Sequence, residues 1–157
     1  MVAKKRSGST QEVQTEIYLF RIEEVVPNYS FGISLGQLQV GPYAEYHHTE
    51  VETVCVSPKR FANRSTNFTL MGDRSHTADL THPNQDSRAR IGVGTLTMRG
   101  DQSSYLGSLP LDAALPIPAL IQSGGYKFIY LAGEPVRYGS ASIRYISFYH
   151  DYDVNEL

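Results

Sequence analysis

The chain has 157 residues, of which 41% are hydrophobic and 19% are charged, and its formal net charge at pH 7 is −2. These values are typical of a globular domain and exclude an intrinsically disordered chain. A net charge this close to zero gives no general attraction for nucleic acid or for membranes. We therefore expect no membrane partner and do not favour nucleic acid as a partner.

The cysteine count and the N-terminal sequence bear on the compartment. Cys55 is the single cysteine, which excludes an intramolecular disulfide. No apolar run of about 18 residues is present, and no apolar segment follows the basic N-terminus, so we expect a cytoplasmic protein without a membrane helix or a secretory signal. We expect residues 1–14 to form a flexible tail, residues 15–150 a single β domain and residues 151–157 an acidic tail.

Two strands are predicted before residue 44. Residues 16–26 combine aromatic and β-branched side chains, and we expect this strand to end at Pro27, which cannot donate to a β-ladder. Residues 31–40 alternate apolar and polar side chains, with a change of parity at Gly36 that indicates a bulge or a bend.

A long strand is predicted over residues 44–56. Its first half is polar on both faces, so we expect that half to project beyond the core or to line a groove. Residues 66–71 predict another strand, with Phe68 and Leu70 inward. A polar loop is expected over residues 73–90, and loops of such length are uncommon unless they are functional or disordered.

The elements that follow are short. Residues 91–98 predict a strand whose two glycines share one face and leave space for a close neighbour. Another strand is expected over residues 105–111. Residues 116–123 are the helix candidate, because proline suits the first turn of a helix and Gly124 suits its end.

A β-hairpin is predicted between residues 126 and 150. Its strands carry apolar side chains on more than one face, and in the second strand the apolar face changes between Tyr145 and Ile146. That change indicates either a bulge or a strand that is covered on both sides. A strand covered on both sides lies inside a sandwich or at an interface between subunits, and we favour the former.

Together these elements predict an all-β fold. We expect an antiparallel sandwich or barrel of roughly seven to nine strands, with one short helix near residues 116–123. The strand order and the choice between a sandwich and a barrel stay open, because alternating patterns do not say which strands pair.

Polar residues that could bind a ligand gather in the strand at 44–56 and in the loop at 73–90. Adjacent residues of a strand point to opposite faces, so His47 and His48 are not expected to serve one site together. Histidine and carboxylate side chains are suitable metal ligands, but His76 and His82 match no zinc motif, so we expect no metal and no other cofactor. The ligand-binding candidates are Glu45, His47, His48, Arg60, Asp73, Arg74, His76, His82 and Arg88.

Two further features could be catalytic but lack a suitable context. Cys55 lies between two valines in an apolar strand, which favours a buried structural thiol over a nucleophile. Glu50 and Glu52 share one face of a predicted strand, and two carboxylates can hydrolyse a glycoside only when they flank a cleft. A solvated strand edge is the more ordinary position for such acids.

The charges are unevenly distributed along the chain. Between Ser57 and Gly100 there are seven basic and three acidic residues, whereas the preceding strand carries Glu45, Glu50 and Glu52. A mixed surface is the plainest explanation. Because arginine prefers bidentate acidic partners, the second explanation is electrostatic contact between neighbouring subunits or neighbouring strands.

Three functions follow, in order of preference. We expect a non-enzymatic β-rich binding or assembly domain that self-associates as a homo-oligomer, with an unknown protein or small ligand as a further partner. The second is a small hydrolase or metal-dependent enzyme that uses histidines of the strand at 44–56 and the loop at 73–90. The third is an anion or nucleic-acid binder through the Arg-rich region at 59–99, whose binding would depend on salt.

Overall fold

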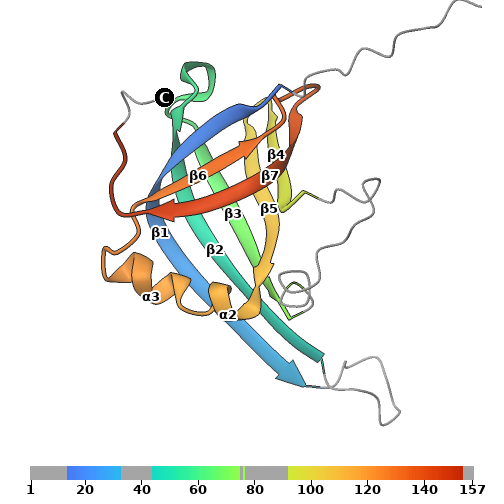
Figure 1. Cartoon of the computed structure of the whole chain (residues 1–157), viewed down its shortest axis with the longest axis vertical. Helices are drawn as coiled ribbons and strands as arrows, with labels where there is room; N and C mark the ends of the chain where they lie inside the picture. The colour runs from blue at the N-terminus through green and yellow to red at the C-terminus, as the bar shows by residue number, and fades with distance from the viewer. Residues whose placement is uncertain (1–13, 33–43, 75, 77–91, 154–157) are drawn as a thin grey trace, which may run out of the picture.

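The computed structural model describes residues 14–32, 44–74, 76 and 92–153, which form a closed barrel of seven strands. The strands are β1 (Glu16–Gly32), β2 (Ala44–Ser57), β3 (Ser65–Asp73), β4 (Gly94–Arg99), β5 (Gln102–Pro110), β6 (Phe128–Gly133) and β7 (Ser140–Tyr149). Their order around the barrel is β1-β2-β3-β5-β4-β7-β6, and β6 pairs with β1 to close the ring (Figure 1). The expected all-β fold is confirmed, and its architecture is a barrel.

One pair of neighbours departs from the expected antiparallel arrangement. Strands β3 and β5 are parallel, whereas every other neighbouring pair in the described barrel is antiparallel. Strand β5 turns back from β4 as a hairpin and then lies beside β3, while β4 pairs on its other side with β7. Alternating side chains determine which face is buried, but they do not determine which strand is the neighbour.

Strand β1 does not end at Pro27, contrary to the prediction. It continues to Gly32, and β6 pairs with it only as far as Arg21. Pro27 therefore lies in the half of β1 that pairs with β2 alone, where a missing N–H interrupts no second ladder. The rest of the strand predicted at 31–40 lies outside the described residues.

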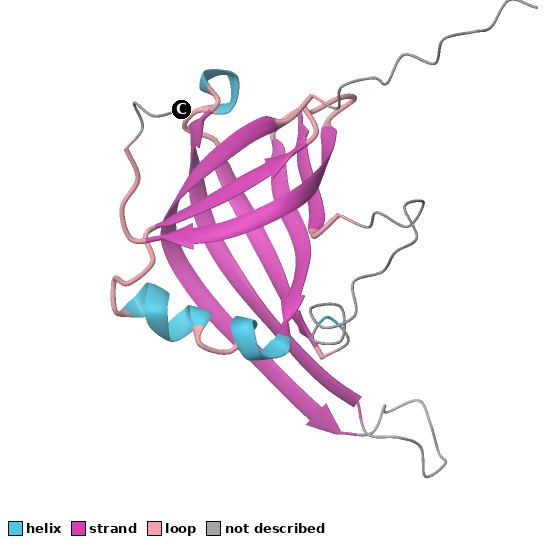
Figure 2. Ribbon diagram, in the orientation of Figure 1, coloured by secondary structure: helices cyan, strands magenta, loops and turns pink. Residues whose placement is uncertain are grey.

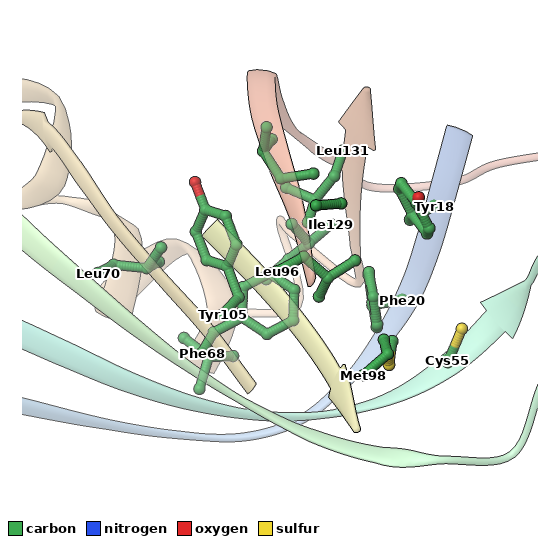
Figure 3. Packing of buried hydrophobic residues seen from close by; sticks show 13 residues of the cluster. Tyr18, Phe20, Cys55, Phe68, Leu70, Leu96, Met98, Tyr105, Ile129 and Leu131 are labelled. Carbon is green, nitrogen blue, oxygen red and sulfur yellow. The ribbon is translucent and has the colours of Figure 1, made fainter. Parts of the chain in front are cut away.

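Apolar side chains fill the interior of the barrel. The Phe68 ring lies between two others, with its centroid 4.9 Å from that of Phe20 and 4.9 Å from that of Tyr105 (Figure 3). Leu70 also points inward, so both inward positions predicted for this strand are confirmed. The other large side chains that are buried in this cluster include Tyr18, Leu96, Ile129, Leu131 and Ile143. Because side chains fill the interior, the surfaces open to a partner are the outside and the ends of the barrel.

The predicted hairpin is present as β6 and β7. The register between them changes from Ala132 opposite Tyr145 to Gly133 opposite Ile143, so β7 contains an extra residue at this point. The change of apolar face therefore reflects a bulge. The close neighbours predicted for the glycines near residue 94 are also present, because a Cβ on Gly94 would meet the Tyr105 ring.

Short helical segments lie at the two ends of the barrel. Helices α2 (Leu111–Ala114) and α3 (Ile117–Gln122) lie beside one end, and the 3₁₀ turn η1 (Lys59–Phe61) projects from the other (Figure 2). Helix α3 is the predicted helix. Helix α2 has four residues and η1 has three, too few to show a helical period. Over the described ranges, no helix is long and apolar enough to cross a membrane.

Candidate binding surface on strands β1, β2, β3 and β5

The later half of β1 and the first half of β2 form an arm, residues 24–32 and 44–50, that extends past the barrel (Figure 1). Strand β6 leaves β1 at Arg21, and β3 pairs with β2 only from His47 onward. The tip of the arm is therefore a two-stranded ribbon. The expectation that the polar half of the 44–56 strand projects is confirmed. Because an isolated ribbon is only marginally stable, its position depends on contacts near its base.

A chain of three side chains ties the arm to the end of β3. Arg74 donates two hydrogen bonds to the Glu45 carboxylate, from Nε at 2.7 Å and from Nη2 at 3.1 Å. Tyr29 Oη donates a third bond to the same carboxylate at 3.2 Å. The Arg74 hydrogen bonds hold the pKa of Glu45 below its usual value, so this carboxyl stays ionised. Bidentate arginine–carboxylate pairs restrict geometry, so the pair orients the arm.

The surface is hollowed by about 630 Å³ at this end of β2 and β3. This volume is within the range of small-ligand pockets. The lining residues are Glu45, Tyr46, His47, His48, Glu50, Thr69, Met71, Gly72, Asp73, Arg74 and Leu111. His47 is buried and the side chain of His48 is 41% exposed, so the two point to opposite faces as predicted. Both nevertheless line the hollow, contrary to the expectation that they would not share a site, because the hollow extends over the end of the sheet.

His47 is the buried polar residue of the hollow. Its Nδ1 has no hydrogen-bond partner in the described part of the chain. Gly72 makes room for this atom, because a Cβ there would lie 2.9 Å from Nδ1 and 2.8 Å from Leu111 Cδ1. Burial lowers the pKa of His47, so its imidazole is neutral at pH 7. An unpaired buried polar atom costs about 1–3 kcal/mol, which makes this nitrogen a point where a bound group would stabilise the protein.

Exposed apolar side chains lie on the outside of the sheet around the hollow. They are Val26 of β1, Tyr46 of β2, Met71 of β3 and Leu106 of β5, each between 44% and 66% exposed. The register places Met71 beside His48 and Leu106 beside Thr69. All four are outward positions of neighbouring strands, so they share one face of the sheet. Met71 and Leu106 are diagonal neighbours, whereas Glu50 and Thr69 lie between Val26 and Leu106.

Three exposed carboxylates, those of Glu24, Glu50 and Glu52, border these apolar side chains. Glu24 is the direct partner of Glu52, and Glu50 is the direct partner of Val26. Among the described ion pairs, these carboxylates have one contact, 3.9 Å between Glu50 Oε1 and His48 Nε2. The four apolar side chains and three carboxylates are called the outer sheet face below.

The structure brings five of the nine predicted binding residues to the hollow, namely Glu45, His47, His48, Asp73 and Arg74. Arg60 lies at the other end of the barrel, where it forms an ion pair with Glu16. His76 is described but does not belong to the lining of the hollow. His82 and Arg88 lie outside the described residues.

The apolar members of the outer sheet face were missed by the sequence analysis. Met71 directly follows the inward Leu70, and Leu106 directly follows the inward Tyr105. Two adjacent large apolar residues in a strand place one of them on the outside. These breaks in the alternation are the signal that would have found the surface.

The potential nucleophile Cys55 is buried, as its apolar strand predicted. Its Sγ lies 3.3 Å from the carbonyl oxygen of Ser57, and burial raises the pKa of the thiol to about 11. The thiol is therefore protonated at neutral pH and unsuited to nucleophilic attack. Within the ranges that the structure describes, no group of three or more His, Cys, Asp or Glu side chains could hold a metal ion.

No protein-family model, curated protein or solved structure matches this chain. The function is therefore inferred from the geometry of the outer sheet face, the arm and the hollow.

Proposed function

We propose that this protein is a non-catalytic assembly module, a β-barrel that binds a second copy of itself through the outer sheet face. The observation that carries the proposal is the exposure of four large apolar side chains from four neighbouring strands in one surface. Large apolar side chains that gather on one exposed face with a polar border mark interaction sites. Burying such a patch stabilises a complex by about 25 cal/mol per Å² of apolar area.

The hairpin of β6 and β7 is a weaker candidate for the interface. The outward ring of Tyr130 packs against Tyr145 and Tyr149, with centroid distances of 6.0 and 6.1 Å. Tyr152, from the segment after β7, packs against Tyr130 at 6.0 Å and against Tyr149 at 5.7 Å. The chain itself therefore covers much of this aromatic face, although Tyr145 stays 52% exposed.

The protonated, buried thiol of Cys55 also supports a binding role over a catalytic one. The arm supports association in a different way. Its hydrogen-bonded base, from Arg74 through Glu45 to Tyr29, holds the projecting ribbon in one orientation before a partner arrives. A surface that is ordered in advance loses less conformational entropy on binding.

The proposal is tested by measuring the mass of the full chain with size-exclusion chromatography and light scattering over a concentration series. We expect a concentration-dependent mass above the 17.5 kDa of one chain. The double substitution Met71→Gln and Leu106→Ser should return the protein to the mass of one chain at the same concentrations. Tyr145→Ser, which removes an exposed aromatic side chain from β7, is the matched control and should assemble like the wild type.

Two outcomes would contradict this assignment. A wild-type chain that keeps the mass of a monomer throughout the micromolar range would remove self-association. Dissociation by Tyr145→Ser, with no effect of the Met71 and Leu106 substitutions, would move the interface to the hairpin of β6 and β7.

A second function is supported by the unpaired Nδ1 of His47, namely binding of a small molecule in the hollow. The ligand class is a neutral molecule that hydrogen-bonds this nitrogen and places an apolar group against Met71 or Leu111. The test is an NMR fragment titration of the wild type, His47→Phe and His48→Phe. Fragments that shift the His47 resonances and lose affinity in His47→Phe alone would support this function, and no shift at His47 would oppose it.

A further inference from the structure

We propose that self-association is head to tail, so that the outer sheet face on the side of one barrel receives a basic cap at the end of the barrel of the next copy. This inference rests on the proposed self-association and adds the partner surface. The basic cap consists of Lys59, Arg60, Phe61, Arg64, Arg99, Arg137 and Tyr138, which lie in and beside the turns after β2, β4 and β6.

Contacts between these three turns hold the cap together. Arg64 Nη2 donates a hydrogen bond of 2.8 Å to the carbonyl of Gly100 in the turn between β4 and β5. The turn between β6 and β7 lies beside the same strand, because Met98 N donates to the carbonyl of Gly139 at 2.8 Å. A Cβ on Gly139 would lie 3.0 Å from the Cβ of Arg99. The turns therefore form one surface.

The cap carries cations that the barrel does not neutralise. Arg60 is paired with Glu16, but Lys59, Arg99 and Arg137 are exposed and take part in no ion pair of the described residues. Arg64 is also without an ion pair among the described residues, and the exposed Asp101 of the turn between β4 and β5 offsets one charge, so the cap keeps an excess of cations. The outer sheet face carries an excess of carboxylates. Complementary charges of this kind select the partner and orient the encounter.

Aromatic side chains lie among these cations. The guanidinium carbons of Arg60 and Arg64 lie 4.8 and 5.6 Å from the centroid of the Phe61 ring. Tyr138 is 98% exposed and has a φ of 52°, which is uncommon for a residue with a side chain. Tyrosine and arginine are enriched among the residues that dominate binding energy at interfaces. The cap thus presents aromatic rings among cations, and the outer sheet face presents apolar side chains among carboxylates.

The position of the two surfaces determines the kind of assembly. The basic cap lies at the end of the barrel where η1 projects (Figure 1), whereas the outer sheet face lies on the side of the barrel, over β1, β2, β3 and β5. A contact between two different surfaces is heterologous and repeats from copy to copy, which gives a ring or an open filament. A two-fold contact would instead bring the Glu24, Glu50 and Glu52 carboxylates of both copies into one interface, which like-charge repulsion disfavours.

Two variants, each with one surface disabled, test this arrangement. The face variant carries Glu50→Gln, Glu52→Gln and Leu106→Ser, and the cap variant carries Arg99→Gln, Arg137→Gln and Tyr138→Ser. All six positions are exposed, so both variants should fold, which far-UV circular dichroism and thermal unfolding check. Lys127→Gln, which removes an exposed cation at the start of β6, is the matched control and should assemble like the wild type.

The expected result is specific to a head-to-tail contact. Light scattering should show each variant alone at 17.5 kDa, with its apparent dissociation constant raised by on the order of 100-fold. An equimolar mixture should form a complex of twice that mass and nothing larger, because the intact cap of one variant binds the intact face of the other. Such a mixture also shows that neither variant is misfolded.

Other results would overturn the inference. Assembly of the cap variant alone at the wild-type concentration would exclude the cap as the partner surface and leave the proposed function in place. If that variant also lost binding to a single-stranded oligonucleotide that the wild type binds, the cap would be a nucleic-acid-binding surface instead. A mixture that stays monomeric would exclude the head-to-tail contact, and a monomeric wild type would remove the proposed function as well.

Discussion

Glu24 of β1 and Glu52 of β2 are direct cross-strand partners, and both are exposed on the outer sheet face. Like charges placed directly opposite one another destabilise a sheet. Glu50, two residues before Glu52 on β2, points to the same side and adds a third carboxylate. The repulsion between these carboxylates lowers the stability of the isolated barrel, and cations from a second copy would offset it.

The substitution Glu52→Lys should therefore have opposite effects on the barrel and on the assembly. A lysine opposite Glu24 should raise the free energy of unfolding of the monomer by about 0.2–1 kcal/mol. The same lysine should weaken self-association, because it repels the basic cap. Urea unfolding of dilute protein measures the first effect and light scattering measures the second. Glu52→Gln should give intermediate values, and a variant that assembles more strongly would contradict the charge argument.

His47 should make the protein sensitive to mild acid. Burial lowers the pKa of His47 in the folded protein below the unfolded value of about 6.5. The unfolded chain therefore binds a proton that the folded chain does not, so the free energy of unfolding should fall as the pH decreases from about 6.5. His47→Leu should flatten this dependence in urea unfolding between neutral pH and the carboxylate range. His48→Leu, one residue along, is the control, and equal slopes for both variants would contradict the assignment.

Cys55 should contribute to a loss of stability in alkali. Its folded pKa of about 11 is above the value of about 8.5 for an unfolded thiol. Between these values the unfolded chain has lost a proton that the folded barrel retains, so the free energy of unfolding decreases as the pH rises. Cys55→Ala should be less stable at neutral pH but should show a shallower decrease. Burial also raises the pKa of Tyr18 and Tyr105, so a slope of the same sign should remain. Identical slopes for the wild type and Cys55→Ala would contradict this account.

Arg74→Ala should loosen the arm without unfolding the barrel. The substitution removes both hydrogen bonds that link Glu45 to the end of β3. Backbone amides in residues 27–32 and 44–47 should exchange faster with deuterium, while those of β6 should be unchanged. Arg21→Ala is the matched control, because the ion pair of Arg21 with Glu23 lies within one strand. Unchanged exchange in the arm of Arg74→Ala would show that the ion pair between Arg74 and Glu45 does not hold the arm in place.

Local patterns predicted most of the strands. The 44–56 and 66–71 strands and the hairpin were predicted because their inward residues alternate. The predicted end of β1 at Pro27 was wrong. The effect of a proline depends on whether a neighbouring strand needs its N–H at that point, and β6 does not reach Pro27. The parallel pair of β3 and β5 could not be predicted either, since the pairing joins strands that are not consecutive in the chain.

The candidate site was likewise predicted only in part. Charge and polarity led to Glu45, His47 and Arg74, which the structure places around one hollow. The unpaired Nδ1 of His47 could not be predicted from the sequence, because it depends on Gly72 and Leu111 packing beside it. Arg60 was grouped with Arg74 by sequence, whereas the barrel places the two at opposite ends.

The amino-acid sequence by itself determined that this chain is a β protein with a buried cysteine, an aromatic hairpin near its C-terminus and a strand whose first half is polar. Those properties follow from side chains that alternate within single strands, and alternation is local. Only the tertiary structure decided that the strands close into a barrel, that Val26, Met71 and Leu106 share an uncovered face, and that Arg60 and Arg74 lie at opposite ends. These properties depend on which distant strands pair, because pairing determines which outward side chains become neighbours and which are left exposed to solvent.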